Sequence, residues 1–213
     1  MAQQSTIEWT DTTWNPVIGC RKVSAGCKNC YAERMAKRLG AMATADREAG
    51  RNPGKKAAYL NILTPRGRWN GSVFLDESSV EVPLSWRTPR VIFVNSMSDL
   101  FHEDVPDDYI YRVAEVMDQA DWHTYQVLTK RAERMAHLLQ TGLRFAAERS
   151  HIWWGVSVEN RQHGFPRLRY LQSTPARMRF LSVEPLLEGL GSIDLQGIHW
   201  VIQVVKVVQG LVQ

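Results

Sequence analysis

Residues 91–99 read VIFVNSMSD, and this stretch sets the pattern on which the fold depends. A short apolar run, rich in branched side chains, is followed at once by small and acidic polar residues. The pattern returns in TYQVLTKR at residues 124–131, in IWWGVSVEN at residues 152–160 and in RMRFLSVEP at residues 177–185. Short apolar runs bounded by polar residues predict buried strands.

Helical segments separate these runs. Pro106, Asp107 and Asp108 open one helix, since proline and acidic residues favour the first helical turn. Apolar residues at helical spacing predict another over residues 131–140. This alternation implies a parallel sheet, so we expect an α/β fold, a partial or complete β/α (TIM-like) barrel of about six parallel strands. The expected strands are residues 72–75, 90–94, 124–128, 152–156, 177–181 and 199–202.

Length and composition favour one domain. The chain has 213 residues, 44% of them hydrophobic, and we expect a single domain over residues 1–213. Residues 43–70 are polar, contain the stretch RNPGKK and predict a mobile insertion. The sequence has neither an apolar run long enough to span a membrane nor a signal peptide pattern, so we expect a cytoplasmic monomer without membrane contact. The net charge of +4 permits nucleic-acid binding without indicating it.

The chain's three cysteines, Cys20, Cys27 and Cys30, lie in one short loop with the spacing C-x6-C-x2-C. In a reducing compartment such thiols are available to metals, and an odd number suits a disulfide framework poorly. Soft thiolates suit an iron–sulfur cluster, and three ligands leave one iron open to a cofactor or substrate. We therefore expect a [4Fe–4S] cluster on this loop, and the apolar spacing after Cys30 predicts a helix that begins there.

Zinc is an alternative metal for the same loop. Cys27 and Cys30 have the spacing of a common zinc half-site. Cys20 and a distant His102 or His123 could complete a tetrahedron. Three buried cysteines without any ligand are a poorer explanation, because the loop is polar.

The polar motifs after the strands predict where the site lies. In β/α barrels the carboxyl ends of the strands carry the chemistry, so the motifs at residues 95–99, 129–131, 157–160 and 182–185 should meet at one mouth. Helix caps and turns are the alternative for any single motif, because serine, threonine, asparagine and aspartate are common there. Four motifs, each with a charged residue, favour a site.

Several stretches together resemble one known family. They are IEWTDTTWNP at residues 7–16, CKNCYAE at 27–33, SMSDLFH at 96–102, GVSVEN at 155–160 and FLSVEPLL at 180–187. These motifs resemble the phage-borne gene product 37/68 family, whose function is unknown and which is similar to radical S-adenosylmethionine (SAM) proteins. The resemblance covers nearly the whole chain, as far as Ile202.

The resemblance implies a cluster whose open iron binds the amino and carboxylate groups of SAM and cleaves SAM reductively, which starts radical chemistry on an unknown substrate. An electron donor such as flavodoxin or ferredoxin would supply the electron. The spacing departs from the C-x3-C-x2-C of the wider superfamily, since its first gap is longer, Asn29 precedes Cys30 and Tyr31 follows it. This departure weakens the expectation of SAM cleavage more than the expectation of cluster binding.

Under this interpretation, residues after the strands contact SAM or the substrate. The catalytic candidates Lys130, Glu159 and Glu184 would meet the carboxylate, amine or ribose of SAM, and Ser96 and Asp99 would face the substrate. A structural salt bridge is the alternative for each. The full set of cofactor-binding candidates is Tyr31, Ser96, Asp99, Ser157, Asn160 and Ser182, beside the metal ligands Cys20, Cys27 and Cys30.

The C-terminus departs from the family that the motifs resemble. Its members continue into Gly-Gly-Glu-Ser-Gly-Pro-Gly-Ala-Arg-Pro, whereas residues 203–213 read QVVKVVQGLVQ. Permitted codons for this tail, read from their third nucleotide, encode that glycine-rich stretch, so we expect a frameshift near Ile202. Glycines at a strand end let the backbone approach a cofactor closely, and their loss would impair catalysis in this chain.

A second function is compatible with the same residues. A phage-associated protein stabilised by an iron–sulfur cluster or by zinc could bind nucleic acid without catalysis. Arg66, Arg68, Arg131 and Arg134 would then contact the phosphates. Salt-dependent DNA binding without SAM cleavage would favour this function.

Overall fold

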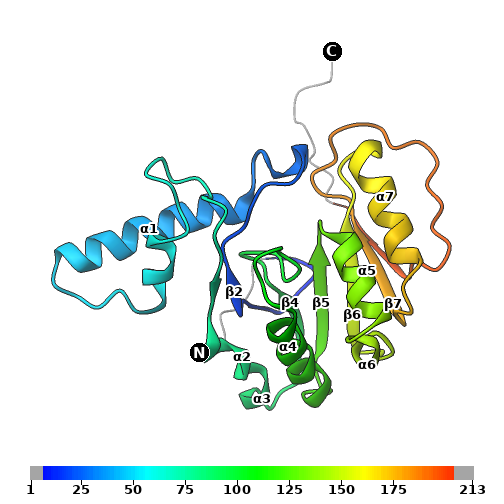
Figure 1. Ribbon diagram of the computed structural model, residues 1–213, viewed down its shortest axis with the longest axis horizontal. Helices are drawn as coiled ribbons and strands as arrows, with labels where there is room; N and C mark the ends of the chain where they lie inside the picture. The colour runs from blue at the N-terminus through cyan, green and yellow to red at the C-terminus, as the bar shows by residue number, and fades with distance from the viewer. Residues whose placement is uncertain (1–6, 204–213) are drawn as a thin grey trace.

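The computed structural model describes residues 7–203 and contains an open parallel sheet of six strands (Figure 1). Neighbouring strands of this sheet follow one another along the chain, and all of them pair in parallel. The carboxyl ends of all six strands therefore lie at the same edge. From one side to the other the strands are β1 (Thr12–Trp14), β4 (Val91–Val94), β5 (Thr124–Thr129), β6 (Ile152–Ser157), β7 (Met178–Ser182) and β8 (Trp200–Ile202).

The α/β fold and the parallel sheet confirm the expectation from the sequence, but the sheet does not close into a barrel. Among the described residues β1 pairs only with β4, and β8 pairs only with β7. The ring centroid of Trp9, which precedes β1, lies 4.7 Å from that of Phe93 in β4 and 6.3 Å from that of Trp200 in β8. The expected frameshifted tail lies, from residue 204 onward, outside the described residues.

One expected strand of the sheet is wrong, and one real strand is missed. Residues 72–75 contain β3 (Phe74–Leu75), which pairs antiparallel with β2 (Val17–Ile18) in a separate small sheet. The remaining strand of the parallel sheet is β1, whose residues 12–14 read TTW and pair with β4. So short a strand carries no recognisable apolar run, and only its partner reveals it.

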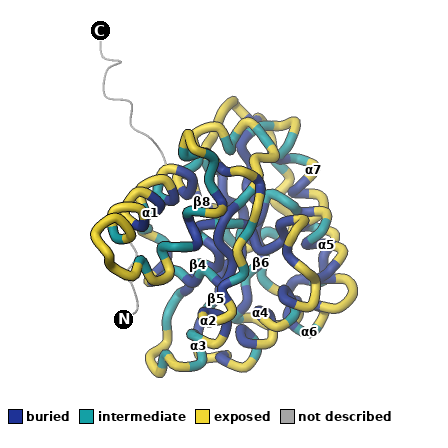
Figure 2. The backbone as a smooth tube through the Cα atoms, turned by 60° about the vertical axis from the view of Figure 1, so that its left-hand side comes forward, coloured by how far each residue is buried: buried dark blue, intermediate teal, exposed yellow. Residues whose placement is uncertain are grey.

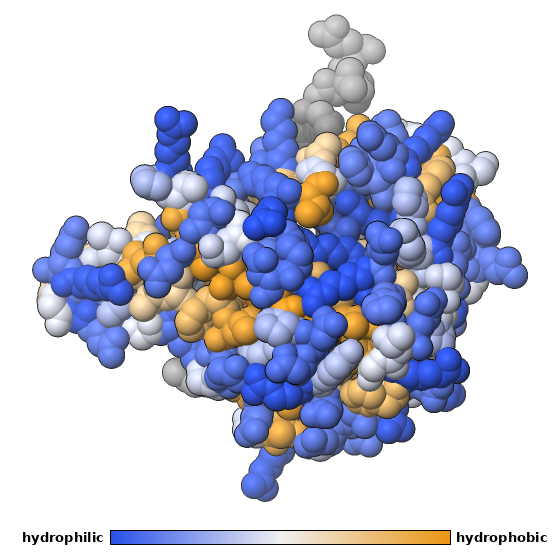
Figure 3. All heavy atoms as spheres, in the orientation of Figure 1, coloured by the Kyte–Doolittle hydropathy of each residue, from blue (hydrophilic) through white to orange (hydrophobic). Residues whose placement is uncertain are grey.

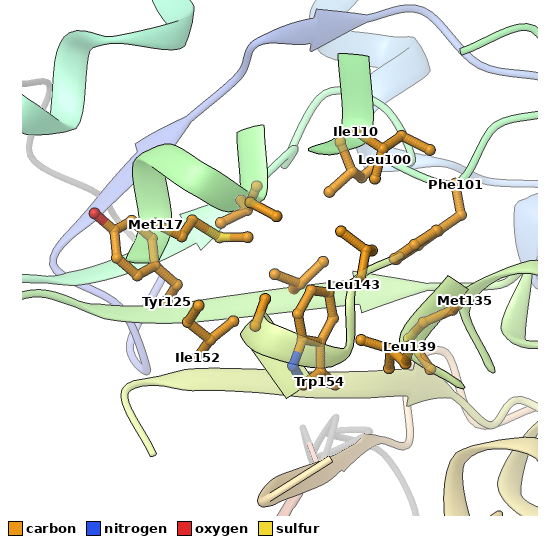
Figure 4. Close-up of a cluster of buried hydrophobic side chains, with 14 of the residues drawn as sticks. Leu100, Phe101, Ile110, Met117, Tyr125, Met135, Leu139, Leu143, Ile152 and Trp154 are labelled. Atoms are coloured by element: carbon orange, nitrogen blue, oxygen red, sulfur yellow. The ribbon is translucent and has the colours of Figure 1, made fainter. Parts of the chain in front are cut away.

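Four helices pack against one face of the sheet, where the main core lies (Figures 1 and 2). Alternate residues such as Ile152 and Trp154 of β6 point into this core and are fully buried. Figure 4 shows them in one cluster with Met117, Met135 and Leu139, which come from helices α4 and α5. The helices are α4 (Asp107–Gln119), α5 (Ala132–Gln140), α6 (Arg144–Ala147) and α7 (Arg161–Gln172), and the short α2 (Glu77–Val80) and α3 (Val82–Ser85) precede β4.

The segment that carries the cysteines leads into a long helix that projects from the sheet (Figure 1). Helix α1 (Tyr31–Glu48) starts directly after Cys30, as the sequence predicts. Residues 43–70, expected to form a mobile insertion, complete α1, form the 3-10 helix η2 (Gly54–Leu60) and bury Ile62 and Trp69 in a second small core; their mobility stays a prediction. Hydrophilic side chains cover most of the face seen in Figure 3, with hydrophobic ones near its centre. No helix within residues 7–203 is long and apolar enough to cross a membrane.

Packing on the opposite face of the sheet requires glycine at position 155. Gly155 in β6 is paired with Phe180 in β7, and the Phe180 ring lies directly over the glycine. A Cβ atom at Gly155 would fall well inside van der Waals distance of that ring. The ring is fully buried and packs near Trp200, so it has little room to move.

We predict that Gly155→Ala lowers the free energy of unfolding by about 2 kcal/mol, because the added methyl group overpacks this face. Gly189→Ala is the matched control, since no atom lies within 4 Å of its Cβ position. Urea denaturation followed by circular dichroism measures both variants. Equal stability of the two variants would contradict the packing at Gly155.

Candidate functional site

A cavity of about 480 Å³ lies at the carboxyl edge of the parallel sheet, between the strand ends and the cysteine loop. Each of the four polar motifs contributes to its wall, so the motifs do converge on one site. Of the residues proposed from the sequence, Cys20, Cys27, Cys30, Tyr31, Ser96, Asp99, Lys130, Ser157, Ser182 and Glu184 line the cavity.

All three cysteines are partly exposed on the wall of this cavity. Cys27 ends the short 3-10 helix η1 (Ala25–Cys27), and Cys30 occupies the N-cap position of α1. The Sγ atom of Cys27 lies 3.8 Å from the hydroxyl of Ser24. Within residues 7–203, no three His, Cys, Asp or Glu side chains lie close enough together to hold a single metal ion.

The Cys20 thiol lies beside a buried ion pair. Nη1 of Arg131 approaches its Sγ atom to 3.8 Å and also pairs with Asp99. Burial raises the pKa of Cys20 to about 12, and the charge of Asp99 adds to this effect while Arg131 opposes it. Because a thiol must lose its proton to bind a metal, metal binding at Cys20 would release a proton.

Asp99 joins the ends of β4 and β5. One carboxylate oxygen accepts hydrogen bonds from the hydroxyl of Thr129 at 2.7 Å and the backbone amide of Phe101 at 3.0 Å. The other oxygen accepts from the backbone amide of Lys130 and from the guanidinium of Arg131, both at 3.1 Å. With both oxygens engaged, Asp99 positions neighbouring segments more than it offers itself to a substrate.

Arg131 extends this network to the cysteine loop. Its Nε donates to Glu103 at 2.7 Å, and its Nη2 donates to the backbone oxygen of Arg21 at 3.3 Å. Arg21 in turn pairs with Glu103 at 2.9 Å. Burial opposes ionisation of Glu103, but a hydrogen bond from its own backbone amide and the contact with Arg131 lower its pKa to about 2. The loop at Cys20 is thus fastened to both strand ends.

Glu159 lies behind the cysteine loop and does not line the cavity. Its fully buried carboxylate pairs with Arg167 at 2.5 Å. A Cβ atom on Gly26 would come within 3.0 Å of the Glu159 side chain, so the loop rests directly on this residue. Burial opposes ionisation, but a hydrogen bond from Ser24 and the charge of Arg167 outweigh it and lower the pKa of Glu159.

Asn160 also lies away from the cavity wall. Its side-chain oxygen accepts a hydrogen bond from the backbone amide of His163 at 2.9 Å and caps helix α7. Asn160 therefore acts as a helix cap, the alternative that the sequence offered for these motifs. Ser157 and Ser182, at the ends of β6 and β7, are almost completely buried on the cavity wall.

The sequence did not single out Asn95, although the structure places it on the cavity wall. Its backbone φ is +60°, a conformation that asparagine tolerates better than most residues, and the residue is 2% exposed. Its Oδ1 accepts from the backbone amide of Val17, whereas its buried Nδ2 has no hydrogen-bond partner among the described residues. A ligand in the cavity could accept from this donor. Its position directly after a buried strand is the feature of the sequence that could have identified Asn95 as a candidate.

Comparison with known proteins gives a family without a known function. A family described as "Protein of unknown function (DUF5131)" matches residues 4–204. No curated protein and no solved structure matches the chain.

We predict that Asp99→Asn destabilises the fold by about 3 kcal/mol, because an amide group would face two donors that now share a carboxylate oxygen. Asp104→Asn is the control, since the Asp104 side chain is 50% exposed. Urea denaturation measures both variants. A similar small effect of both substitutions would show that Asp99 does not fasten the strand ends.

In the metal-free protein, the rate of Cys20 alkylation by iodoacetamide should rise about tenfold per pH unit from pH 7 to about pH 10.5, because only the thiolate reacts. No plateau is expected in this range, since the pKa of Cys20 is raised to about 12. Peptide mass spectrometry follows the reaction. The urea-unfolded chain is the control: with the ordinary cysteine pKa of 9.0, its rate should be half-maximal at that pH and level off by about pH 10.5. A plateau below about pH 10.5 in the folded protein would contradict the burial of this thiol.

Proposed function

This chain belongs to the DUF5131 family of proteins of unknown function, and we propose a radical SAM-like role for it from the geometry of its cavity. In this proposal Cys20, Cys27 and Cys30 hold a [4Fe–4S] cluster, and the adjoining cavity binds SAM. The observation that carries the proposal is that all three thiols share one cavity with the carboxyl ends of four parallel strands. An open parallel sheet with its strands in chain order also suits a partial β/α barrel.

The donor set fits a cluster better than a single zinc ion. A zinc ion needs its ligands to meet at one point, which no three such side chains in the described part of the chain do. His102 and His123, the two candidates for a further zinc ligand, are buried and do not line the cavity. In an iron–sulfur cluster each thiolate binds a different iron, so the thiols need only line one wall.

The cavity offers complementary groups for each part of SAM. When bound, the cluster would supply the electron that cleaves SAM. Lys130 offers a cation for the carboxylate of SAM, and the hydroxyls of Ser157 and Ser182 can pair with its polar groups. The side-chain amide nitrogen of Asn95, which has no hydrogen-bond partner within residues 7–203, adds a fixed donor. Trp9, Phe93 and Leu128 give the cavity apolar walls that exclude water from a reactive intermediate.

Nucleic-acid binding through all four arginines named from the sequence has weaker support, because every one of them except Arg66 is already paired. Arg131 pairs with Asp99 and Glu103, and Arg134 pairs with Asp107. Arg68 pairs with Glu33. Cations that are already neutralised contribute little to phosphate binding.

Anaerobic reconstitution with iron and sulfide tests the proposal. We predict that the wild-type chain binds about four irons, turns brown and, after reduction, cleaves SAM to methionine and deoxyadenosine more slowly than a chain in which the glycine-rich stretch replaces residues 204–213. Cys27→Ala should lose most of the iron and all cleavage. Glu184→Ala should keep the iron and its absorbance and lose cleavage, because Glu184 lines the cavity without belonging to the thiol set.

Metal analysis, absorbance spectra and chromatography of the nucleoside product give the three readouts. Ser78→Ala, at a residue that does not line the cavity, is the control for handling and should behave as wild type. Binding of one zinc ion in place of iron would refute the cluster. Full iron loading without SAM cleavage would keep the cluster and refute the catalytic part.

A further inference from the structure

A second hollow, of about 320 Å³, adjoins the cysteine-lined cavity, and Cys30 lines both. Its walls come from the end of the cysteine loop, the first two turns of α1 and the turn at residues 64–68. The hollow is strongly basic. The cations that line it are Lys28, Arg34, Lys37, Arg66 and Arg68.

Most of this positive charge is not neutralised. Lys28, Arg34, Lys37 and Arg66 are exposed and form no ion pair with the residues that the structure describes. Glu33, the acidic residue that lines the hollow, is already engaged elsewhere. The hollow therefore carries a positive potential that favours an anionic ligand.

Glu33 is held as a structural carboxylate. It accepts from Lys22 at 2.7 Å, from Arg68 at 3.0 Å and from the backbone amide of Trp69 at 3.0 Å. Burial opposes its ionisation, but these three donors outweigh burial and lower its pKa. A ligand would thus meet four free cations and a carboxylate whose charge is already satisfied.

The wall of the hollow is a formed structure. Hydrogen bonds from Thr64 to the carbonyl of Arg68 at 2.7 Å and from Gly67 to the carbonyl of Thr64 at 2.8 Å close the turn. Gly67 has a φ of +71°, and a Cβ atom there would lie 2.7 Å from the side chain of Lys37. The glycine therefore allows the Lys37 chain to cross the turn that carries Arg66. Two elements distant in sequence present their cations to one space.

We infer that this basic hollow binds the phosphates of a nucleic-acid strand, whose neighbouring nucleotide enters the cysteine-lined cavity. Phosphates are the ligands that clustered lysine and arginine favour, and four free cations can contact several of them. Tyr31 follows Cys30, lines the cavity and is 53% exposed, so its ring is available to stack on a base. This inference names nucleic acid as the substrate class of the proposed function. Binding of the strand does not depend on the proposed function, whereas any reaction on the bound nucleotide does.

The test measures binding of a fluorescein-labelled single-stranded oligothymidylate by fluorescence anisotropy over a range of salt concentrations. The double variant Arg34→Gln/Lys37→Gln should bind about 10-fold more weakly, and its slope of log affinity against log salt should fall in magnitude by about 1.4, the value for two phosphate contacts to a single strand. Arg87→Gln/Arg169→Gln removes the same charge from exposed arginines that do not line the hollow and should match wild type. Thermal unfolding checks that both double variants are folded.

Competitors and metal loading distinguish the remaining outcomes. Equal binding by both double variants, or no binding by wild type, would overturn the inference. Displacement of the oligonucleotide by pyrophosphate at equal phosphate concentration would indicate a site for a small anion. Displacement by polyglutamate would indicate an acidic protein partner. Either result would also overturn the inference. Binding is measured before and after iron reconstitution, so loss of SAM cleavage with intact oligonucleotide binding would refute the proposed chemistry alone.

Discussion

The carboxylate of Asp99 is the contact on which the arrangement of the site depends. Backbone donors beyond the last residue of a parallel strand have no ladder partner, so the segments after β4 and β5 need another acceptor. Asp99 supplies it to Lys130 and at the same time pairs with Arg131, whose guanidinium reaches the Cys20 loop. A buried carboxylate needs such partners to remain charged, and here they come from separate segments. Satisfying one charge therefore fixes three parts of the chain relative to each other.

Two further buried carboxylates hold the cysteine loop at other points. Glu159 lies under Gly26 in the middle of the loop and is paired with Arg167. Glu33 binds Lys22 at one side of the loop and the Arg68–Trp69 segment at the other. The loop is thus held by charge pairs along its length. Such pairs add little net stability, because the cost of burying the charges offsets much of their attraction. Their main effect is to fix the position of the loop. Fixed geometry is what a site of three thiols requires.

The sequence predicted the strands with long apolar runs and the helices with clear spacing. It failed where an element depends on its partner. Residues 12–14 become a strand of the main sheet through pairing with β4, and residues 74–75 leave that sheet because their partner is β2. The strand-end motifs were correctly expected to converge, but the sequence could not distinguish the residues that line the cavity from those that only support the structure around it. Glu159 and Asn160 belong to a motif at the site, yet one supports the loop and the other caps a helix.

The sequence by itself determined the α/β class, the shared edge of the strand ends and the three clustered thiols, because these follow from local patterns of hydrophobicity and from residue spacing. Only the tertiary structure decided which charged side chains form ion pairs within the described part of the protein and which do not. Arg131 and Arg66 are the same residue type in the sequence, but Arg131 is neutralised by Asp99 and Glu103 while Arg66 faces a basic hollow. Electrostatic roles depend on distances between segments remote in sequence, and those distances exist only after folding.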